Sequence, residues 1–310
     1  QESAGVSAES SQDDSVPEVV AGSDDDCGQD SSVSGGGNPT DVAAGENSVT
    51  LKRWENADEE TRLELATPVE SSSRFNKQKA DSIEWAQFTW NPVTGCLTDC
   101  PYCYARDFQL RLHKSFEPMF HRDRLAAPQK TPVPKTDGHN HVFLCSAADL
   151  WGEWVPEEWI RAVLDACREA PKWVFIALTK NPGRYQEFID IIPGNVWLGA
   201  TADTQMRADS ATLALMRLRK KTRRHVLFLS CEPLAEMISL KAGRWEAIDW
   251  LIIGPRSQNQ KLPAMQPNWE WVEVLLGQSR KSPTSVYFKP NLVVRPQEYP
   301  GTWSDKQRLP

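Results

Sequence analysis

The sequence lacks long apolar runs. No stretch approaches the roughly 18 uninterrupted apolar residues typical of a membrane-spanning helix, although apolar residues make up 40% of the 310 positions. The first residues also lack the basic and apolar segments of a secretory signal, and the chain opens on Gln1 and not on methionine, as expected of a processed or truncated product. We therefore expect a cytoplasmic protein without membrane contact, with enough apolar residues for a real core.

Residues 1–50 have almost no aromatic side chains and consist largely of Ser, Gly, Asp and Glu. Such a segment cannot bury enough apolar surface to offset the entropy lost on ordering, so we expect a disordered acidic tail. Residues 51–80 are less polar and are interpreted as a linker or one short helix. The net charge of −7 is unevenly distributed. Residues 1–80 carry a net charge of −11, whereas residues 81–310, the expected folded domain, carry a net charge of +4.

The seven cysteines lack the even spread of a disulfide framework, which indicates a reducing compartment. Cys96, Cys100 and Cys103 follow a C-x₃-C-x₂-C spacing that lets all three thiols point inward from one loop. Three thiolates cannot close a four-ligand structural zinc site, but they can hold three irons of a [4Fe–4S] cluster and leave the fourth iron open to a small molecule. The alternative is a zinc site completed by a distant residue, with His113 and His121 the nearest candidates.

Short apolar, β-branched runs alternate with helix-length segments along the rest of the chain. The expected strands are 83–90, 141–145, 174–178, 196–200, 226–229, 250–253 and 285–288, and the expected helices are 104–112, 156–170, 184–191, 203–221 and 269–278. This alternation implies parallel strands in βαβ units and hence an α/β fold. Seven strands fit an incomplete (βα) TIM-type barrel better than an eight-stranded one. The proline-rich segment 116–134 is long enough to form a lid or substrate loop.

Polar side chains follow nearly every expected strand. In (βα) barrels the chemistry lies on the loops after the strands, so these positions are the candidates for a site. In chain order they are Cys145, Ser146 and Asp149, then Thr179 and Lys180, Thr201 and Asp203, Ser230, Cys231 and Glu232, Gly254, and Lys289.

These motifs and the cysteine loop carry a resemblance over residues 83–290. The chain resembles a phage- and prophage-associated family of three-cysteine proteins, distant relatives of spore photoproduct lyase within the radical S-adenosylmethionine (SAM) superfamily. The matching pieces are Thr89–Cys96, Phe116–Pro118, Ser146–Leu150, Leu178–Lys180, Ser230–Leu234 and Phe288–Lys289. The chain departs from many relatives at Gly254-Pro255, where they have Gly-Gly, so a SAM contact from that loop is not implied.

The resemblance implies an enzyme that uses a [4Fe–4S] cluster bound by Cys96, Cys100 and Cys103. One electron from the reduced cluster, delivered by an external donor of flavodoxin or ferredoxin type, would cleave SAM to methionine and a 5′-deoxyadenosyl radical. The substrate class implied is a nucleic acid or a nucleotide.

The resemblance also implies which residues bind SAM. Tyr102 matches an aromatic position beside the adenine, and Ser146 and Asp149 end a strand where relatives hold the SAM ammonium. Thr201 ends the fourth strand and is expected among the cofactor-binding residues. Tyr102 could instead pack on the loop, and Asp149 could instead cap a turn before Trp151.

Three further residues are candidates for the chemistry. Lys180 and Glu232 are expected to bind the SAM carboxylate and ribose, or to form a structural ion pair with each other. Glu232 is also a candidate catalytic residue. Cys145 matches the place of a cysteine that returns a hydrogen atom to the product radical in the lyase relative, whereas a buried small hydrophobe is the commoner role for such a cysteine.

The alternative function is a zinc- or Fe–S-stabilised nucleic-acid-binding module without catalysis. The run Arg217–Arg224 packs six bases into eight residues, which predicts either a solvated helix end or a phosphate-binding patch. An Fe–S electron carrier is disfavoured because one iron would lack a ligand. The polar strand ends favour the enzyme.

Overall fold

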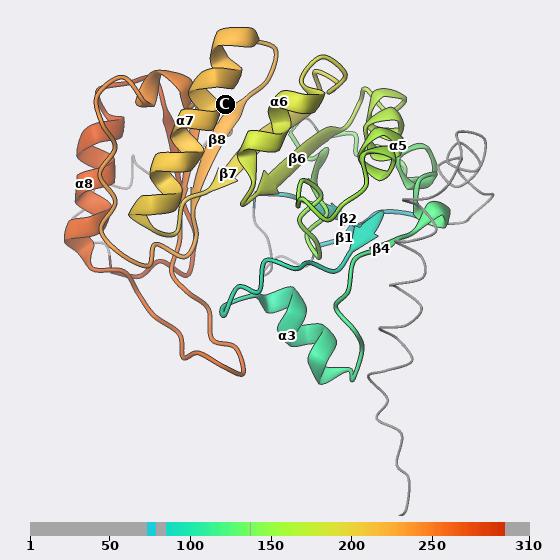
Figure 1. Ribbon diagram of the computed structural model, residues 1–310, viewed down its shortest axis with the longest axis horizontal. Coiled ribbons are helices and arrows are strands. Elements are labelled where there is room, and N and C mark those ends of the chain that lie inside the picture. The colour runs from blue at the N-terminus through green and yellow to red at the C-terminus, as the bar shows by residue number, and fades with distance from the viewer. Residues whose placement is uncertain (1–72, 79–84, 137, 295–310) are drawn as a thin grey trace, which may run out of the picture. The chain divides into compact units, whose positions relative to one another are not determined.

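The computed structural model describes residues 73–78, 85–136 and 138–294, so the expected tail and most of the expected linker lie outside the described residues. Its centre is an eight-stranded sheet in the order β1-β2-β5-β6-β7-β8-β9-β10 (Figure 1). The strands are β1 (Asn76–Lys77), β2 (Phe88–Trp90), β5 (His141–Leu144), β6 (Val174–Thr179), β7 (Val196–Thr201), β8 (Leu227–Cys231), β9 (Trp250–Ile253) and β10 (Ser285–Phe288).

The seven strands from β2 to β10 are all parallel and lie in chain order, and only β1 is antiparallel. A mostly parallel α/β fold is therefore confirmed. Among the described strands β10 pairs with β9 and β1 with β2, so hydrogen bonds do not close this sheet into a barrel.

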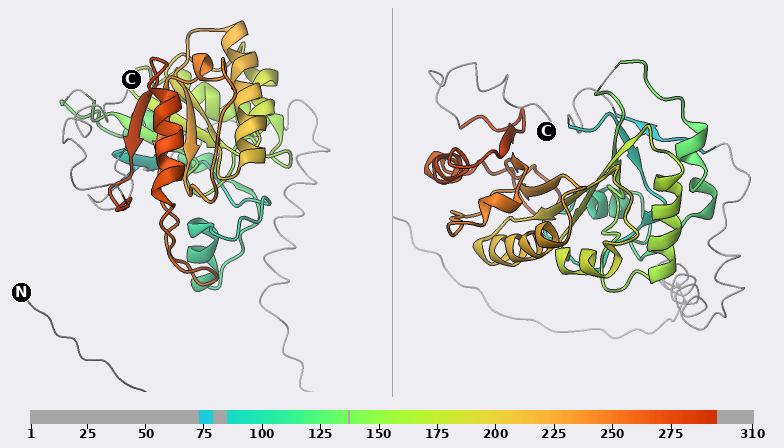
Figure 2. Two further views of the ribbon diagram at one scale, coloured as in Figure 1. Left: turned by 90° about the vertical axis from the view of Figure 1, so that its left-hand side faces the viewer. Right: turned by 90° about the horizontal axis from the view of Figure 1, so that it is seen from above.

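Helices cover one face of the sheet (Figure 2). They are α5 (Glu157–Arg168), α6 (Tyr185–Phe188), α7 (Gln205–Lys221) and α8 (Trp269–Ser279). Their apolar side chains pack with those of the strands in the main core, as Val163 of α5 and Leu215 of α7 do. α6 is shorter than the expected helix 184–191, and a 3-10 turn at Pro182–Arg184 precedes it.

Large aromatic side chains fill the opposite face of the sheet. Because successive side chains of a strand alternate in direction, Trp250 and Ile252 lie in this second cluster, whereas Leu251 and Ile253 lie in the main core. The second cluster also contains Trp85, Trp197, Phe228 and Tyr287. Gly199 makes room for it, since a Cβ there would lie 2.0 Å from the Phe228 ring. This face of the sheet is thus packed with aromatic side chains.

The first strand differs from the prediction. It spans Phe88–Trp90 instead of 83–90, and the antiparallel β1 pairs with its outer edge. Phe75, just before β1, is buried in the main core, so the packed part of the chain reaches back into the segment interpreted as a linker.

The proline-rich segment 116–134 is not a free lid. Its strand β4 (Met119–Phe120) pairs with β3 (Val93–Thr94), and it continues through a 3-10 turn at Arg122–Arg124 into α4 (Ala127–Lys130). Leu125 is 1% exposed, because apolar residues in this segment pack on the main core. No helix among the described residues is both long and apolar enough to cross a bilayer.

Candidate functional site

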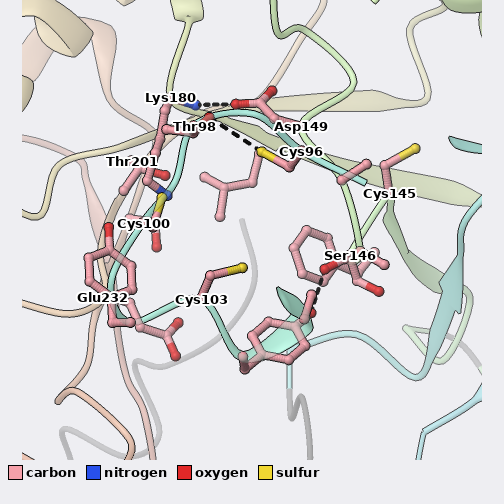
Figure 3. Close-up of a pocket in the computed structure, with 18 of the residues that line it drawn as sticks. Cys96, Thr98, Cys100, Cys103, Cys145, Ser146, Asp149, Lys180, Thr201 and Glu232 are labelled. Atoms are coloured by element: carbon pink, nitrogen blue, oxygen red, sulfur yellow. Dashed lines mark hydrogen bonds between the residues drawn. The ribbon is translucent and has the colours of Figure 1, made fainter. Parts of the chain in front are cut away.

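A cavity of about 410 Å³ lies where the parallel strands end. The ten residues expected to bind the cluster or SAM or to act in catalysis all line it: Cys96, Cys100, Tyr102, Cys103, Cys145, Ser146, Asp149, Lys180, Thr201 and Glu232. Three other strand-end candidates are not among its lining residues: Asp203, Cys231 and Gly254. In Figure 3 the sulfurs of the three loop cysteines surround one space. Parallel strands bring these distant segments together because their carboxyl ends share one edge of the sheet.

Gly95 determines how the chain enters the cysteine loop. Its φ of +83° lies in the left-handed region, and a Cβ at this position would come within 1.9 Å of the Glu117 carbonyl oxygen. The Gly95 N–H donates to the Ala147 carbonyl (2.9 Å), and the next N–H, of Cys96, donates to the Phe116 carbonyl (3.0 Å). The loop is thereby attached both to the segment after β5 and to the segment before β4.

Arg106, which sequence reasoning missed, holds the loop from the other side. Its guanidinium donates to the Cys96 carbonyl (2.8 Å), pairs with Asp99 and lies 5.5 Å from the centre of the Phe116 ring. It belongs to α3 (Tyr104–Arg111), at whose start the Arg106 N–H donates to the Cys103 sulfur (3.4 Å). An arginine three residues after a cysteine is too common a pattern to have identified this role.

The three loop thiols are half-buried. Burial raises the pKa of Cys100 and of Cys103, and the Lys180 cation opposes this shift. Among the described residues no three His, Cys, Asp or Glu side chains are grouped closely enough to bind one metal ion. Ligands of a single zinc ion converge on it at about 2.3 Å for each sulfur, whereas each thiolate of a four-iron cluster binds a different iron.

Neither histidine of the zinc alternative lines the cavity. The His121 ring Nε2 lies 2.8 Å from the Thr94 hydroxyl, between β4 and β3. Burial lowers the pKa of His121 to about 4. His113 is exposed beyond α3. The placement of both side chains favours a structural role over a zinc site.

Tyr102 connects the loop to the end of β7. Its hydroxyl donates to the Asp203 carboxylate, which also pairs with Arg207 of α7. Lys180 Nζ lies 5.4 Å from the centre of the Tyr102 ring. Asp203 is almost fully buried, and its second carboxylate oxygen has no hydrogen-bond partner among the described residues. The Tyr102 side chain is therefore held by Asp203, outside the loop, and it also lines the cavity.

Asp149 accepts three hydrogen bonds at the base of the cavity. One oxygen accepts from the Thr179 hydroxyl (2.6 Å) and the Trp151 N–H (3.1 Å), and the other accepts from the Lys180 N–H (2.9 Å). Burial raises the pKa of Asp149, although these bonds favour the charged form. The carboxylate thus caps the turn before Trp151, the structural role that the sequence left open, and joins the end of β5 to that of β6.

Asn91 positions Ser146. The Asn91 side-chain oxygen accepts from the Ser146 hydroxyl (3.2 Å) and from the Ala147 N–H (2.8 Å). The Tyr104 hydroxyl donates to the Ser146 carbonyl (2.6 Å). Residues of the Thr89–Cys96 motif therefore shape the wall that carries Ser146.

The ion pair between Lys180 and Glu232, the structural alternative to SAM binding by these residues, is not observed. Glu232 pairs instead with Lys289 at the end of β10, with 2.8 Å between Oε1 and Nζ. Gly254 permits this pair, since a Cβ there would lie 2.9 Å from the Lys289 side chain and 3.1 Å from that of Glu232. Thr201, at the end of β7, lines the same cavity but is 3% exposed.

Cys145 differs from the loop cysteines. It is 3% exposed, and burial raises the pKa of its thiol to about 12. Figure 3 shows its sulfur pointing away from the three loop sulfurs. Its placement resembles that of a packed core thiol more than that of a group offered to a ligand.

The basic run Arg217–Arg224 lies at the other end of the strands. It ends α7 and precedes the amino end of β8, whereas the cavity lies at the carboxyl ends. Arg219 pairs with Asp249, and Arg224 donates to the Ile189 carbonyl. These contacts favour the helix-end interpretation of the run.

Comparison with known proteins gives one family and one structural likeness. A family model described as "Protein of unknown function (DUF5131)" matches residues 80–295. No curated protein matches the chain. Spore photoproduct lyase complexed with dinucleoside spore photoproduct is similar at 11% identity, over 76% of this chain and 86% of that chain, with a TM-score of 0.49. A cysteine-to-alanine mutant of that lyase is similar at 12% identity, over 74% and 84%, with a TM-score of 0.49.

Proposed function

The chain belongs to the family described as Protein of unknown function (DUF5131), and from its pocket we propose that it is a radical SAM enzyme. In this proposal Cys96, Cys100 and Cys103 bind a [4Fe–4S] cluster, and SAM occupies the rest of the cavity. The sheet, with seven parallel strands in chain order, would be a partial (βα) barrel of the radical SAM kind. The substrate class is a nucleic acid or a nucleotide.

One observation carries the proposal: three thiols of a single loop line one cavity together with polar groups from successive strand ends. The donor set suits the cluster, since three thiolates leave one iron open for a chelating ligand. The cavity volume of about 410 Å³ falls within the range of about 300–1,000 Å³ of small-molecule sites. When bound, the cluster would supply the single electron that cleaves SAM reductively.

The chain's own residues would bind and orient SAM. Lys180 has no carboxylate partner within ion-pair distance among the described residues, which supports it as a cation for the SAM carboxylate. Ser146 and Thr201 would form hydrogen bonds to SAM through their hydroxyls on the cavity wall. Asp149 would contribute its charge, and it would also orient Lys180 by accepting a hydrogen bond from the Lys180 N–H. Glu232, paired with Lys289, would accept a hydrogen bond from the ribose.

Several sequence expectations stay predictions. The ring of Tyr102 beside the adenine, the catalytic roles of Glu232 and Cys145, the external electron donor, the cytoplasmic location and the phage association are among them. The burial of the Cys145 thiol gives hydrogen-atom return no support.

Anaerobic reconstitution with iron and sulfide tests the proposal. We expect about four irons and four sulfides per chain and broad absorbance near roughly 400 nm. Cys100→Ala should lose this absorbance, whereas Cys27→Ala and Cys167→Ala should keep it, because Cys167 lies in the core and not in the cavity. Addition of dithionite and SAM should then yield 5′-deoxyadenosine. Tightly bound stoichiometric zinc without a cluster would refute the proposal.

A further inference from the structure

The segment after β9, residues 255–265, forms an arm that connects the cavity to the cysteine loop. Its base is closed by reciprocal hydrogen bonds between the backbones of Arg256 and Met265, each 2.9 Å. Its far end contacts the loop region, where the Asn259 side chain donates to the Pro101 carbonyl (2.8 Å) and the Gln260 N–H donates to Asp107 of α3 (2.9 Å). Figure 1 shows the arm extending from the sheet to α3. Pro255, Arg256 and Ser257 of this arm line the cavity.

Arg256, at the base of the arm, lines the cavity and carries a charge that no acid neutralises in the described part of the chain. Its side chain makes one hydrogen bond there, from Nε to the Pro263 carbonyl (3.1 Å), and its two terminal nitrogens make none. The neighbouring cation Lys289 is already paired with Glu232. A guanidinium with both terminal nitrogens available matches the geometry of a phosphate group, which it can bind with two parallel hydrogen bonds.

The same cavity also has an aromatic wall. Phe143, which is half-buried, and Trp85, which is 4% exposed, are among its lining residues, and their rings are tilted by 58° with centroids 4.7 Å apart. Aromatic rings of this kind are the usual stacking surface for nucleic-acid bases, at about 1–3 kcal/mol per base. A molecule that carries both an aromatic base and a phosphate would satisfy the two features together.

We propose that Arg256 binds a phosphate group of a nucleotide substrate whose base stacks on Phe143, the partly exposed ring of this aromatic wall. This inference rests on the proposed function, in which Lys180 binds the SAM carboxylate. It specifies which substrate the same site would bind. It gives the arm a role in recognition: the arm places the phosphate-binding residue and is itself attached to the cysteine loop. Binding of the substrate phosphate is then mechanically linked to the loop that carries the thiols.

Fluorescence anisotropy with a fluorescein-labelled, five-nucleotide single strand of DNA tests the proposal on the full chain after reconstitution. We expect Arg256→Gln to weaken binding at least tenfold and Arg256→Lys to weaken it less, because lysine keeps the charge but not the paired geometry. Arg217→Gln removes the same charge from the basic run, so its affinity should be unchanged. Thermal unfolding of each variant would show that the fold is retained.

Competition separates the possible sources of the phosphate. A mixture of the four deoxynucleoside 5′-monophosphates should displace the labelled strand if a free nucleotide is the substrate. A longer strand should displace it while the monophosphates do not if the substrate is a polymer. The four nucleosides should compete poorly in either case.

Unchanged affinity in Arg256→Gln, or a loss in Arg217→Gln alone, would overturn the assignment, as would the absence of any binding. The same titration on the chain without iron keeps the two proposals apart. A chain that binds the strand through Arg256 but takes up no cluster refutes the proposed function alone, whereas a chain with a full cluster and no dependence on Arg256 refutes this inference alone.

Discussion

The Asp149 side chain contributes both to the proposed SAM site and to the stability of the fold. A buried carboxylate that accepts three hydrogen bonds is stabilised by them, and its replacement leaves donors without an acceptor. In Asp149→Asn the amide nitrogen would face either the Lys180 N–H or the donors from Thr179 and Trp151. The change therefore tests a structural contribution that exists before any ligand binds.

We expect Asp149→Asn to lower the free energy of unfolding by about 1–3 kcal/mol, the cost of an unsatisfied buried group. Urea denaturation of the unreconstituted chain measures this loss. Asp190→Asn, at an exposed position, removes the same charge and should change stability little. Equal stability of the two variants would show that Asp149 is not a structural cap. SAM binding to the reconstituted variant then tests the predicted cofactor role separately.

At this scale the sequence predicts which residues gather but not how they pair. The three loop thiols were identifiable from their spacing, and Lys180 and Glu232 because polar residues directly after apolar runs are expected at strand ends. The partner of Glu232 was not identifiable, since Lys289 is distant in the chain and the choice between it and Lys180 depends on side-chain reach across the strands. Arg106 and Asn91 were missed because each forms a hydrogen bond with a backbone group. Every residue carries such groups, so the residue types do not show which one a side chain will contact.

At the scale of elements, the cysteine loop depends on one backbone conformation. Gly95 has a positive φ, and the Glu117 carbonyl occupies the space that a side chain would need. The pairing of β3 with β4 holds the backbone at both Gly95 and Glu117. Moving either residue away would therefore disturb the hydrogen bonds of this hairpin. Gly243 provides a matched comparison, because its φ of +82° is nearly the same but no described atom lies within 4 Å of an added Cβ.

We expect Gly243→Ala to cost about 1–2 kcal/mol of stability, the strain of a left-handed L-residue. Gly95→Ala should cost a further 1–3 kcal/mol or so, because the added methyl overlaps backbone atoms. Urea denaturation compares the two, and iron content after reconstitution should fall in Gly95→Ala alone. Indistinguishable variants would mean that the approach of Glu117 to the loop does not constrain it.

Element boundaries show where sequence patterns are insufficient. β9 and β10 match their predicted spans, because each is a short apolar run bounded by polar residues. Segment 116–134 was interpreted as a possible lid or substrate loop because four of its 19 residues are prolines. Its apolar residues attach it to the domain instead, since burial of Leu125 and Ala127 fixes the segment to the core.

At the scale of the whole molecule, the order of the seven parallel strands follows from the alternation of strands and helices, but the eighth strand does not. Asn76 and Lys77 form β1 with both side chains exposed, so no apolar pattern marks them. Their pairing is supported by the preceding residue, Phe75, whose ring lies 4.9 Å from that of Trp173 between centroids. Its N–H also donates to the buried Thr131 hydroxyl (2.9 Å).

Two truncations test where the domain begins. A chain of residues 51–310 should fold and take up iron like the full chain, because the acidic segment 1–50 contributes no expected core. A chain of residues 79–310 also loses Phe75 and β1, and we expect its free energy of unfolding to fall by at least about 3–5 kcal/mol, the usual cost of removing a buried phenylalanine. Phe75→Ala in the full chain should reproduce most of this loss. Full stability of the shorter chain would show that β1 covers the sheet edge without stabilising it.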